Sequence, residues 1–188
     1  MSAEGLGSGE RPKAGRMAFV VGHRGAPSLA PENTVPSFLR AIEAGADFIE
    51  VDVWRTDDGE VVVIHDSRVD RTTDSEGPVS ELKLMELKTL DAGGWFAPKF
   101  RGVKVPTLEE ALAVIKDRAS VVVHIKETGV EENVIGILRE KDMVHDSIII
   151  ADTDRAAVRI KELEPKIPIQ ADMRLPLKEL SGMARGQR

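Results

Sequence analysis

Apolar and polar residues alternate along this chain in the order typical of an α/β domain. Short runs rich in Val and Ile predict strands, and longer segments with apolar residues three or four positions apart predict helices. We expect strands at about Phe19–Val21, Phe48–Thr56, Glu60–His65, Val121–Lys126, Ile148–Ala151 and Ile167–Ala171. We expect helices at about Val35–Ala44, Ser80–Leu90, Thr107–Lys116, Glu131–Lys141 and Asp154–Glu164, with part of a last helix in the tail Pro176–Arg188.

The second and third strands predict an antiparallel hairpin, because Asp57-Asp58-Gly59 is too short for a parallel crossover. A two-residue type I′ turn at Asp58-Gly59 would place Asp52 opposite His65, with both side chains on one face. Glu50 shares that face because side chains alternate along a strand. A three-residue loop with a bulge would shift this register.

Length and composition fit one globular domain of 188 residues. The net charge of −6, without a basic stripe, argues against a nucleic-acid partner, and the absence of Cys excludes disulfide and thiol chemistry. No apolar run approaches the roughly 18 residues of a membrane span, so we expect no membrane insertion. Residues 1–16 are rich in Gly and polar residues and predict a flexible leader without a secretory signal, which favours a cytoplasmic protein.

Several polar residues stand at the ends or inside of the apolar runs of the first strands, where an unpaired charge is costly. The candidates are, in chain order, His23, Arg24, Glu50, Asp52, His65 and, on a later strand, Lys126. Glu50 and Asp52 are hard oxygen ligands one pleat apart, which suits Mg²⁺ or Ca²⁺. The Arg and Lys can bind a phosphate, and the two His can move protons near neutral pH. Together these groups predict a phosphoryl-transfer site.

Five short motifs form a combination far more specific than any of them alone. They are His23-Arg24-Gly25, Pro31-Glu32-Asn33-Thr34, Glu50-Val51-Asp52-Val53, Val62-Val63-Ile64-His65-Asp66 and Val105-Pro106-Thr107-Leu108-Glu109-Glu110. This set resembles the glycerophosphodiester phosphodiesterase family, over roughly Phe19 to Asp172. The resemblance implies a TIM-barrel (β/α) fold of the phospholipase-C-like type with a divalent metal at its mouth. It also implies hydrolysis of glycerophosphodiesters, which are small molecules, to glycerol 3-phosphate and an alcohol.

The resemblance assigns roles to residues by position. His23 and His65 match the catalytic acid and base pair. The other implied roles are phosphate contact for Arg24 and Lys126, metal binding for Glu50 and Asp52, and support of the site for Glu32 and Asn33.

One departure concerns the third metal ligand, which in the family is a Glu two residues before the Lys of the fourth strand. Here His124 takes that place, and Lys126 keeps its own. Imidazole suits Zn²⁺, Mn²⁺ or Fe²⁺ better than Ca²⁺ or Mg²⁺, so His124 weakens the expected Mg²⁺ or Ca²⁺ site and also admits Mn²⁺ or Zn²⁺. Glu127 is a substitute ligand only if it departs from simple alternation, which puts it on the opposite face.

The second departure is length, because a TIM barrel typically needs about 250 residues. With six strands predicted, residues 17–188 form an incomplete barrel that lacks its last strands, with an insertion over the mouth at about 67–105. Within this insertion Trp95 and Phe96 are expected to form a lid. An open barrel exposes two strand edges, so a homo-oligomer that covers them is one interpretation.

Each site residue also has a purely structural interpretation. Arg24 can pair with Asp52 or Glu50, Lys126 can be an ordinary salt-bridge partner, and His124 can be a neutral buried His. At the level of function, two alternatives stay open. One is a non-catalytic or impaired relic that retains the fold as a binding protein, and the other is a lysophospholipase D-type phosphodiesterase.

Overall fold

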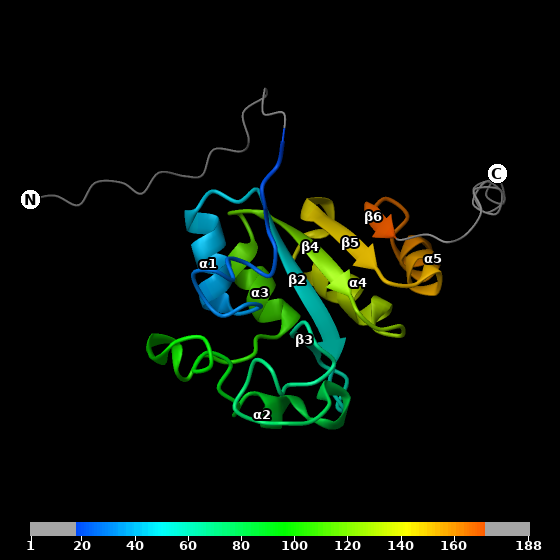
Figure 1. Ribbon diagram of the computed structural model, residues 1–188. Coiled ribbons are helices and arrows are strands. Elements are labelled where there is room, and N and C mark those ends of the chain that lie inside the picture. Colours follow the sequence, from blue (N-terminus) through cyan, green and yellow to red (C-terminus); the bar gives the residue numbers. More distant parts are fainter. Residues whose placement is uncertain (1–17, 172–188) are drawn as a thin grey trace, which may run out of the picture.

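The computed structural model describes residues 18–171, and these residues form one six-stranded sheet with helices on one face (Figure 1). The strands are β1 Val21–Gly22, β2 Phe48–Arg55, β3 Val61–Val63, β4 Ser120–Ile125, β5 Ser147–Ala151 and β6 Ile169–Ala171. The α-helices are α1 Val35–Glu43, α2 Leu84–Leu87, α3 Leu108–Ile115, α4 Glu131–Glu140 and α5 Asp154–Leu163, with 3₁₀ turns at Val79–Glu81, Pro98–Phe100 and Val144–Asp146. The predicted leader and tail helix lie outside the described residues.

The strand order is β1-β2-β4-β5-β6, and all these neighbours are parallel. Helices α1, α3, α4 and α5 each precede the next parallel strand, which is the repeating unit of a (β/α) barrel wall. Within residues 18–171, β1 pairs only with β2 and β6 only with β5, so the wall is open. The predicted α/β fold with an incomplete barrel is therefore confirmed.

None of the helices in this part of the chain is long and apolar enough to cross a membrane.

Alternation along the strands separates a helix-facing side of the sheet from a site-facing side. In β2, Ile49, Val51 and Val53 are buried in the main hydrophobic core, whereas Glu50 and Asp52 point to the opposite side. The same core contains Val121, Val123 and Ile125 of β4, Ile149 and Ala151 of β5, and helix residues Phe38, Leu112, Ile115, Ile135, Leu138 and Ile160. Because this apolar face must be buried against the helices, the alternate side chains of each strand point to the site-facing side.

The N-terminus of α3 is fixed by the capping box that the sequence predicts. Thr107 Oγ1 accepts a hydrogen bond from the backbone N–H of Glu110, and Glu110 Oε2 accepts one from the backbone N–H of Thr107. The helix packs beside α1 and α4 and buries Leu108 and Leu112. The capping box therefore determines where the helix starts, and packing of its apolar side chains in the core determines its position.

The hairpin forms, but the predicted register is wrong by one residue. Arg55 pairs with Val61, and the Thr56 N–H donates to the Glu60 carbonyl, so the loop is the three residues Asp57-Asp58-Gly59. Gly59 adopts the left-handed conformation with φ of 90°. The residue opposite Asp52 is consequently Ile64, whose N–H donates to the Asp52 carbonyl, and not His65. Strand β3 also ends at Val63, two residues before His65.

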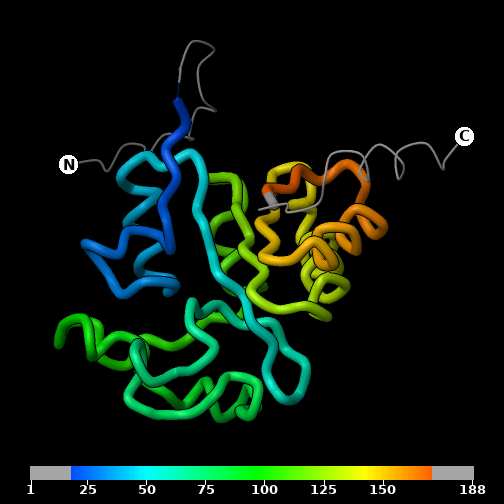
Figure 2. Tube along the Cα trace, turned by 45° about the vertical axis from the view of Figure 1, so that its right-hand side comes forward, coloured from blue at the N-terminus to red at the C-terminus, as the bar shows by residue number. Residues whose placement is uncertain are grey.

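The segment between β3 and α3 forms a separate lobe beside the carboxyl end of β2 (Figures 1 and 2). The single helix predicted at 80–90 is wrong, because the chain there makes a 3₁₀ turn at Val79–Glu81 and the short helix α2. The lobe has its own small apolar cluster, to which Trp54 of β2 adds its ring. This cluster contains Val62, Ile64, Val69, Val79, Leu87, Ala92 and Val105.

Candidate functional site

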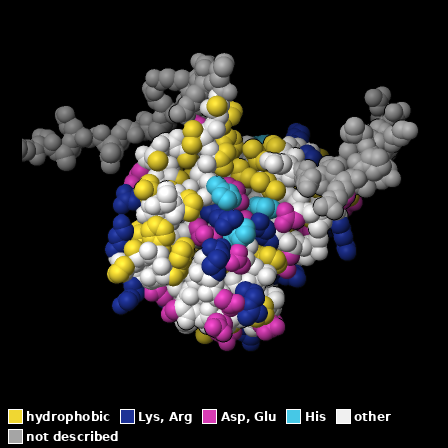
Figure 3. All heavy atoms as spheres, in the orientation of Figure 1, with side chains coloured by type: hydrophobic (Ala, Val, Ile, Leu, Met, Phe, Trp, Pro, Cys, Tyr) yellow, Lys and Arg dark blue, Asp and Glu magenta, His cyan; other side chains and the backbone are white. Residues whose placement is uncertain are grey.

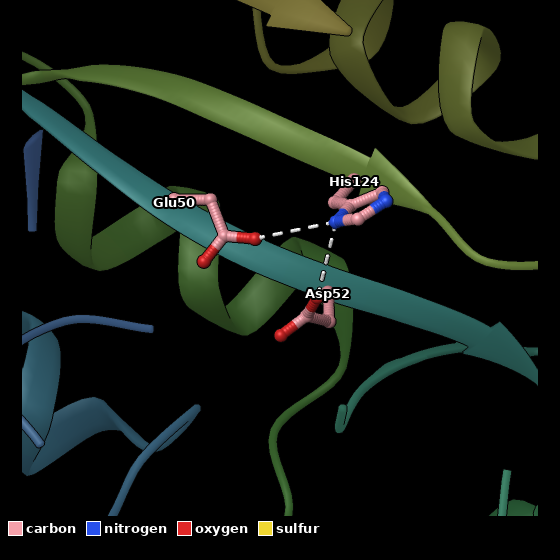
Figure 4. A group of neighbouring side chains, drawn as sticks. All are labelled: Glu50, Asp52 and His124. Atoms are coloured by element: carbon pink, nitrogen blue, oxygen red, sulfur yellow. Dashed lines mark ion pairs between the residues drawn. The ribbon is translucent and has the colours of Figure 1, made fainter. Parts of the chain in front are cut away.

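The sheet brings three predicted metal ligands together on its site-facing side. Strands β2 and β4 are in register at Asp52 and His124, and Glu50 lies one pleat back along β2. His124 Nδ1 is 3.4 Å from Asp52 Oδ1 and 3.7 Å from Glu50 Oε1 (Figure 4). One ligand atom from each of the three residues lies within 4.8 Å of the others. The arrangement is thus that of a convergent donor set with two carboxylates and one imidazole.

The turn after β1 places the backbone of Arg24 against this set. Arg24 and Gly25 have positive φ values of 56° and 86°, and a Cβ on Gly25 would lie 2.4 Å from Ser37 Oγ. Only glycine fits there, because the turn runs directly over α1. In this conformation the Arg24 N–H donates to Glu50 Oε2 at 2.8 Å, which orients the carboxylate. Such strained backbone is typical of functional sites.

Glu32 and Asn33, to which the resemblance assigns support of the site, contact two of its other residues. Asn33, with φ of 55°, donates from Nδ2 to Asp52 Oδ2 at 2.8 Å. Glu32 Oε1 accepts a hydrogen bond from Arg24 Nη1 at 3.0 Å. These two contacts hold Asp52 and Arg24 in place.

The two groups expected to bind phosphate both lie against Asp52. Arg24 Nε is 3.4 Å from Asp52 Oδ2, and Lys126 Nζ is 3.1 Å from Asp52 Oδ1. Burial alone would raise the pKa of the Asp52 carboxyl, but the neighbouring His124 ring, the hydrogen bond from Asn33 and the charge of Lys126 hold that pKa well below its ordinary value. Asp52 is therefore a carboxylate at neutral pH.

His124 is half-buried, and each of its ring nitrogens has a partner. Nδ1 faces Glu50 and Asp52, and Nε2 lies 2.6 Å from Asp152 Oδ1. Burial lowers the pKa of His124, but hydrogen bonds to Asp52, Glu50 and Asp152 outweigh that effect and raise the pKa above its ordinary value, against the opposing charge of Lys126. Protonated His124 and Lys126 are thus two cations that compete for the same carboxylates.

The two histidines expected to move protons lie at the edges of this cluster. The His23 side chain is 67% exposed, and its Nε2 is 4.0 Å from Glu50 Oε2. His65 Nδ1 is 2.6 Å from Asp66 Oδ1, and no hydrogen bond or ion pair links His65 to Glu50 or Asp52 in the described residues. Histidine, basic and acidic side chains gather at the centre of one molecular face (Figure 3).

Arg71 is a site residue that the sequence analysis missed. Its guanidinium bridges Glu32 and Asp66, with Nη2 2.7 Å from Glu32 Oε1 and Nε 2.6 Å from Asp66 Oδ2. The hydrogen bond from Arg71 lowers the pKa of Asp66 to about 2, although partial burial opposes the shift. Arg71 follows β3 in an irregular segment, so no periodicity in the sequence points to it.

Asp152 was also missed, although the sequence contains a signal for it. It directly follows the buried strand β5, and in a parallel sheet the residues after the strands meet at one edge. Glu127, the substitute ligand considered above, is used elsewhere. Its Oε1 accepts a hydrogen bond from the backbone N–H of Arg55 at 2.6 Å.

The donor set fits a divalent cation. Asp52 Oδ1 is fully buried, and although Lys126 Nζ and His124 Nδ1 lie 3.1 and 3.4 Å away, it accepts no hydrogen bond of good geometry among the described residues. This state is unusual for a carboxylate oxygen. The site contains five carboxylates and three permanent cations, so its negative charge exceeds its permanent positive charge by two. The carboxylates belong to Glu32, Glu50, Asp52, Asp66 and Asp152, and the cations to Arg24, Arg71 and Lys126. Two oxygen donors with one imidazole suit Mn²⁺ or Zn²⁺ as well as Mg²⁺.

Comparison with known proteins places this chain in a family. The model of the glycerophosphoryl diester phosphodiesterase family matches residues 23–177. A glycerophosphodiester phosphodiesterase of Caldanaerobacter subterraneus subsp. tengcongensis is 42% identical over 158 residues, which cover 80% of this chain and 65% of that protein. The chain therefore spans less than two thirds of the length of this relative.

Solved structures of the same kind share the fold. The crystal structure of a glycerophosphodiester phosphodiesterase from Agrobacterium tumefaciens superposes with a TM-score of 0.78 at 37% identity, covering 81% of this chain and 66% of that one. An Oleispira antarctica phosphodiesterase in complex with the product sn-glycerol-3-phosphate gives 0.79 at 30% identity, covering 89% and 72%. The chain belongs to the glycerophosphoryl diester phosphodiesterase family.

Proposed function

We propose that this chain carries the site of a metal-dependent phosphodiesterase that hydrolyses glycerophosphodiesters to glycerol 3-phosphate and an alcohol. The observation that carries the proposal is the convergence of Glu50, Asp52 and His124 beside an Arg, a Lys and a His. Family membership supports the reaction class. The product bound to the Oleispira antarctica relative supports glycerol 3-phosphate as the product here.

Glu50, Asp52 and His124 would hold the divalent cation. When bound, this ion supplies positive charge that stabilises the phosphoryl oxygens as negative charge develops on them. Arg24 and Lys126 add two further positive groups at the same place, and both are now paired with Asp52. A phosphate diester would compete with Asp52 for these two side chains.

His23 and His65 are the proposed proton-transfer pair. One takes the proton of the attacking oxygen, and the other gives a proton to the leaving alcohol. His23 lies in the turn that directly follows β1, near Glu50, and Asp66 fixes the ring of His65 through Nδ1. Glu32 and Asn33 contribute by holding Arg24 and Asp52, without touching the reacting atoms.

The test is turnover of glycerophosphocholine by the full chain after treatment with a chelator. We expect release of glycerol 3-phosphate only after Mg²⁺, Ca²⁺, Mn²⁺ or Zn²⁺ is returned, and no release by the Glu50→Gln variant under any of these conditions. Absence of turnover with all four ions would reject the proposal and favour the non-catalytic relic. Faster turnover of lysophosphatidylcholine than of glycerophosphocholine would instead favour the lysophospholipase D activity.

A further inference from the structure

The ring of His124 lies between two different sets of acidic groups. Its Nδ1 faces the carboxylates of Glu50 and Asp52, 3.7 and 3.4 Å away, whereas its Nε2 is 2.6 Å from Asp152 Oδ1 on the opposite side (Figure 4 shows the first pair). Asp152 directly follows β5, the strand that pairs with β4. The aspartate thus approaches the imidazole from outside the donor set.

The hydrogen-bond partners of the ring define which nitrogen is free to bind a cation. Without a metal ion the protonated ring has an N–H on both nitrogens, and a cation that binds Nδ1 must replace the proton there. The neutral ring then keeps one N–H, and because an aspartate carboxylate can only accept, the bond to Asp152 places that hydrogen on Nε2. The Lys126 ammonium, which can only donate, lies nearer to Nδ1, at 3.0 Å, than to Nε2, at 3.4 Å. In the neutral ring, Asp152 thus favours the tautomer that leaves Nδ1 free to bind a cation.

The position of the Lys126 ammonium indicates where the donor set attracts a positive charge. Its Nζ lies between His124 Nδ1 and Asp52 Oδ1, at 3.0 and 3.1 Å, so a positive charge already bridges two of the three donor atoms. Asp52 Oδ1 is buried and makes no hydrogen bond of good geometry to it. A divalent ion would satisfy this oxygen better than the ammonium does.

We propose that Asp152 is a positioning residue that orients His124 through Nε2–H, so that Nδ1 serves as the third ligand of the metal ion. The proposal rests on the metal site of the proposed function and assigns to this chain a carboxylate–histidine–metal arrangement. It also explains how an imidazole can occupy a place where the family pattern has a Glu, because Asp152 increases the basicity of Nδ1 and fixes the ring.

Asp152 is well suited to a direct test. Its side chain is half exposed, and the bond to His124 is its only side-chain hydrogen bond within residues 18–171. Replacement should therefore leave the fold intact. Asp154, in the first turn of α5, does not contact His124 and provides a control for loss of one nearby negative charge.

The first measurement is Mn²⁺ affinity by calorimetry of the full chain without substrate. We expect Asp152→Ala to weaken Mn²⁺ binding by about 10-fold to 100-fold, Asp152→Asn to restore most of the affinity because its amide oxygen still accepts from Nε2–H, and Asp154→Ala to change little. In a His124→Glu background Asp152→Ala should cause no loss, because a glutamate has no N–H to donate. An equal loss in both backgrounds, no loss in the wild-type background, or no Mn²⁺ binding by the wild-type chain would overturn the proposal.

The second measurement is the ¹⁵N spectrum of the His124 ring with Zn²⁺ bound. We expect a hydrogen on Nε2 and a ligated Nδ1, and ligation through Nε2 would overturn the proposal. Neither measurement uses a substrate. A chain that shows the coupling but no turnover would reject the proposed hydrolysis alone, and an active chain without the coupling would reject the role of Asp152 alone.

Discussion

Asp52 links almost every group of the site. Asn33 and Arg24 lie at one of its carboxylate oxygens, and Lys126 and His124 lie at the other. Burial of a carboxylate lowers the stability of the fold strongly unless nearby positive charges such as these stay in place. The site is therefore held together by charge balance around one residue, and a bound cation would change the partners of all the others.

The proposed proton-transfer pair gives a prediction at this scale. His23→Ala and His65→Ala should each reduce the rate of glycerophosphocholine hydrolysis by about 10²-fold or more, because each removes one proton-transfer step. Mn²⁺ affinity should stay unchanged in both. His145→Ala, in the exposed 3₁₀ turn Val144–Asp146, is the matched control and should retain full rate. Full metal-dependent turnover in either site variant would reject the assignment.

Arg71 gives a prediction about pH. Its hydrogen bond lowers the pKa of Asp66 from 3.8 to about 2. Because the folded-state pKa is the lower one, the pair stabilises the fold above the unfolded value, and this stabilisation is lost as pH falls through about 2. In Arg71→Ala the Asp66 carboxyl should titrate closer to 3.8, as measured by ¹³C NMR.

Arg68→Ala is the control for this titration, because Arg68 pairs with Asp70 and does not contact Asp66. It should leave the Asp66 midpoint near 2. An unchanged midpoint in Arg71→Ala would show that another group holds the carboxylate ionised.

At the scale of elements, the sequence predicted what depends on local chemistry or on periodicity. The capping box of α3 and the parallel strands lie within a few residues of their predicted places. The hairpin register was wrong because the Asp57–Gly59 loop has three residues, and composition alone does not distinguish this loop from a two-residue turn. The prediction of a helix at 80–90 was wrong because the lobe buries its apolar residues in an irregular cluster.

The capping box of α3 is the element whose stability can be tested most simply. Thr107→Ala removes the side-chain acceptor for the Glu110 N–H and should lower the free energy of unfolding by about 1 kcal/mol. Urea denaturation measures this change. Thr128→Ala, at an exposed loop position, should alter stability by less than about 0.5 kcal/mol. Equal effects of the two changes would show that the cap does not contribute.

The site residues also differ in whether the sequence could predict them. Glu50, Asp52 and His124 could be placed together from strand alternation and motif spacing, whereas Arg71 and Asp152 depend on how loops fold back over the sheet. The sequence allowed a salt bridge of Lys126, but its partner, Asp52, could not be predicted because it depends on the charge balance of the assembled site.

At the scale of the whole molecule, the open sheet is the main feature. Within the described residues β1 and β6 each have one paired side, and Phe19, Val20 and Val21 near the β1 edge are about half exposed. Exposed edges with apolar side chains favour pairing with another chain. The homo-oligomer expected from the sequence stays a prediction.

We predict that the full chain self-associates in a concentration-dependent manner, with a second copy covering the β1 edge, as measured by analytical ultracentrifugation. Val21→Lys should weaken this association by placing a charge at the edge. Met85→Lys, which changes an 84% exposed residue of α2, should not. A chain that stays monomeric at about 100 µM, where weak protein contacts form, would contradict the prediction.

The most direct test of the metal site is X-ray diffraction at the manganese absorption edge from crystals of the full chain soaked in MnCl₂. We predict one anomalous peak bounded by Glu50, Asp52 and Nδ1 of His124. No peak at this position, or a peak that persists in the Asp52→Asn variant, would contradict it.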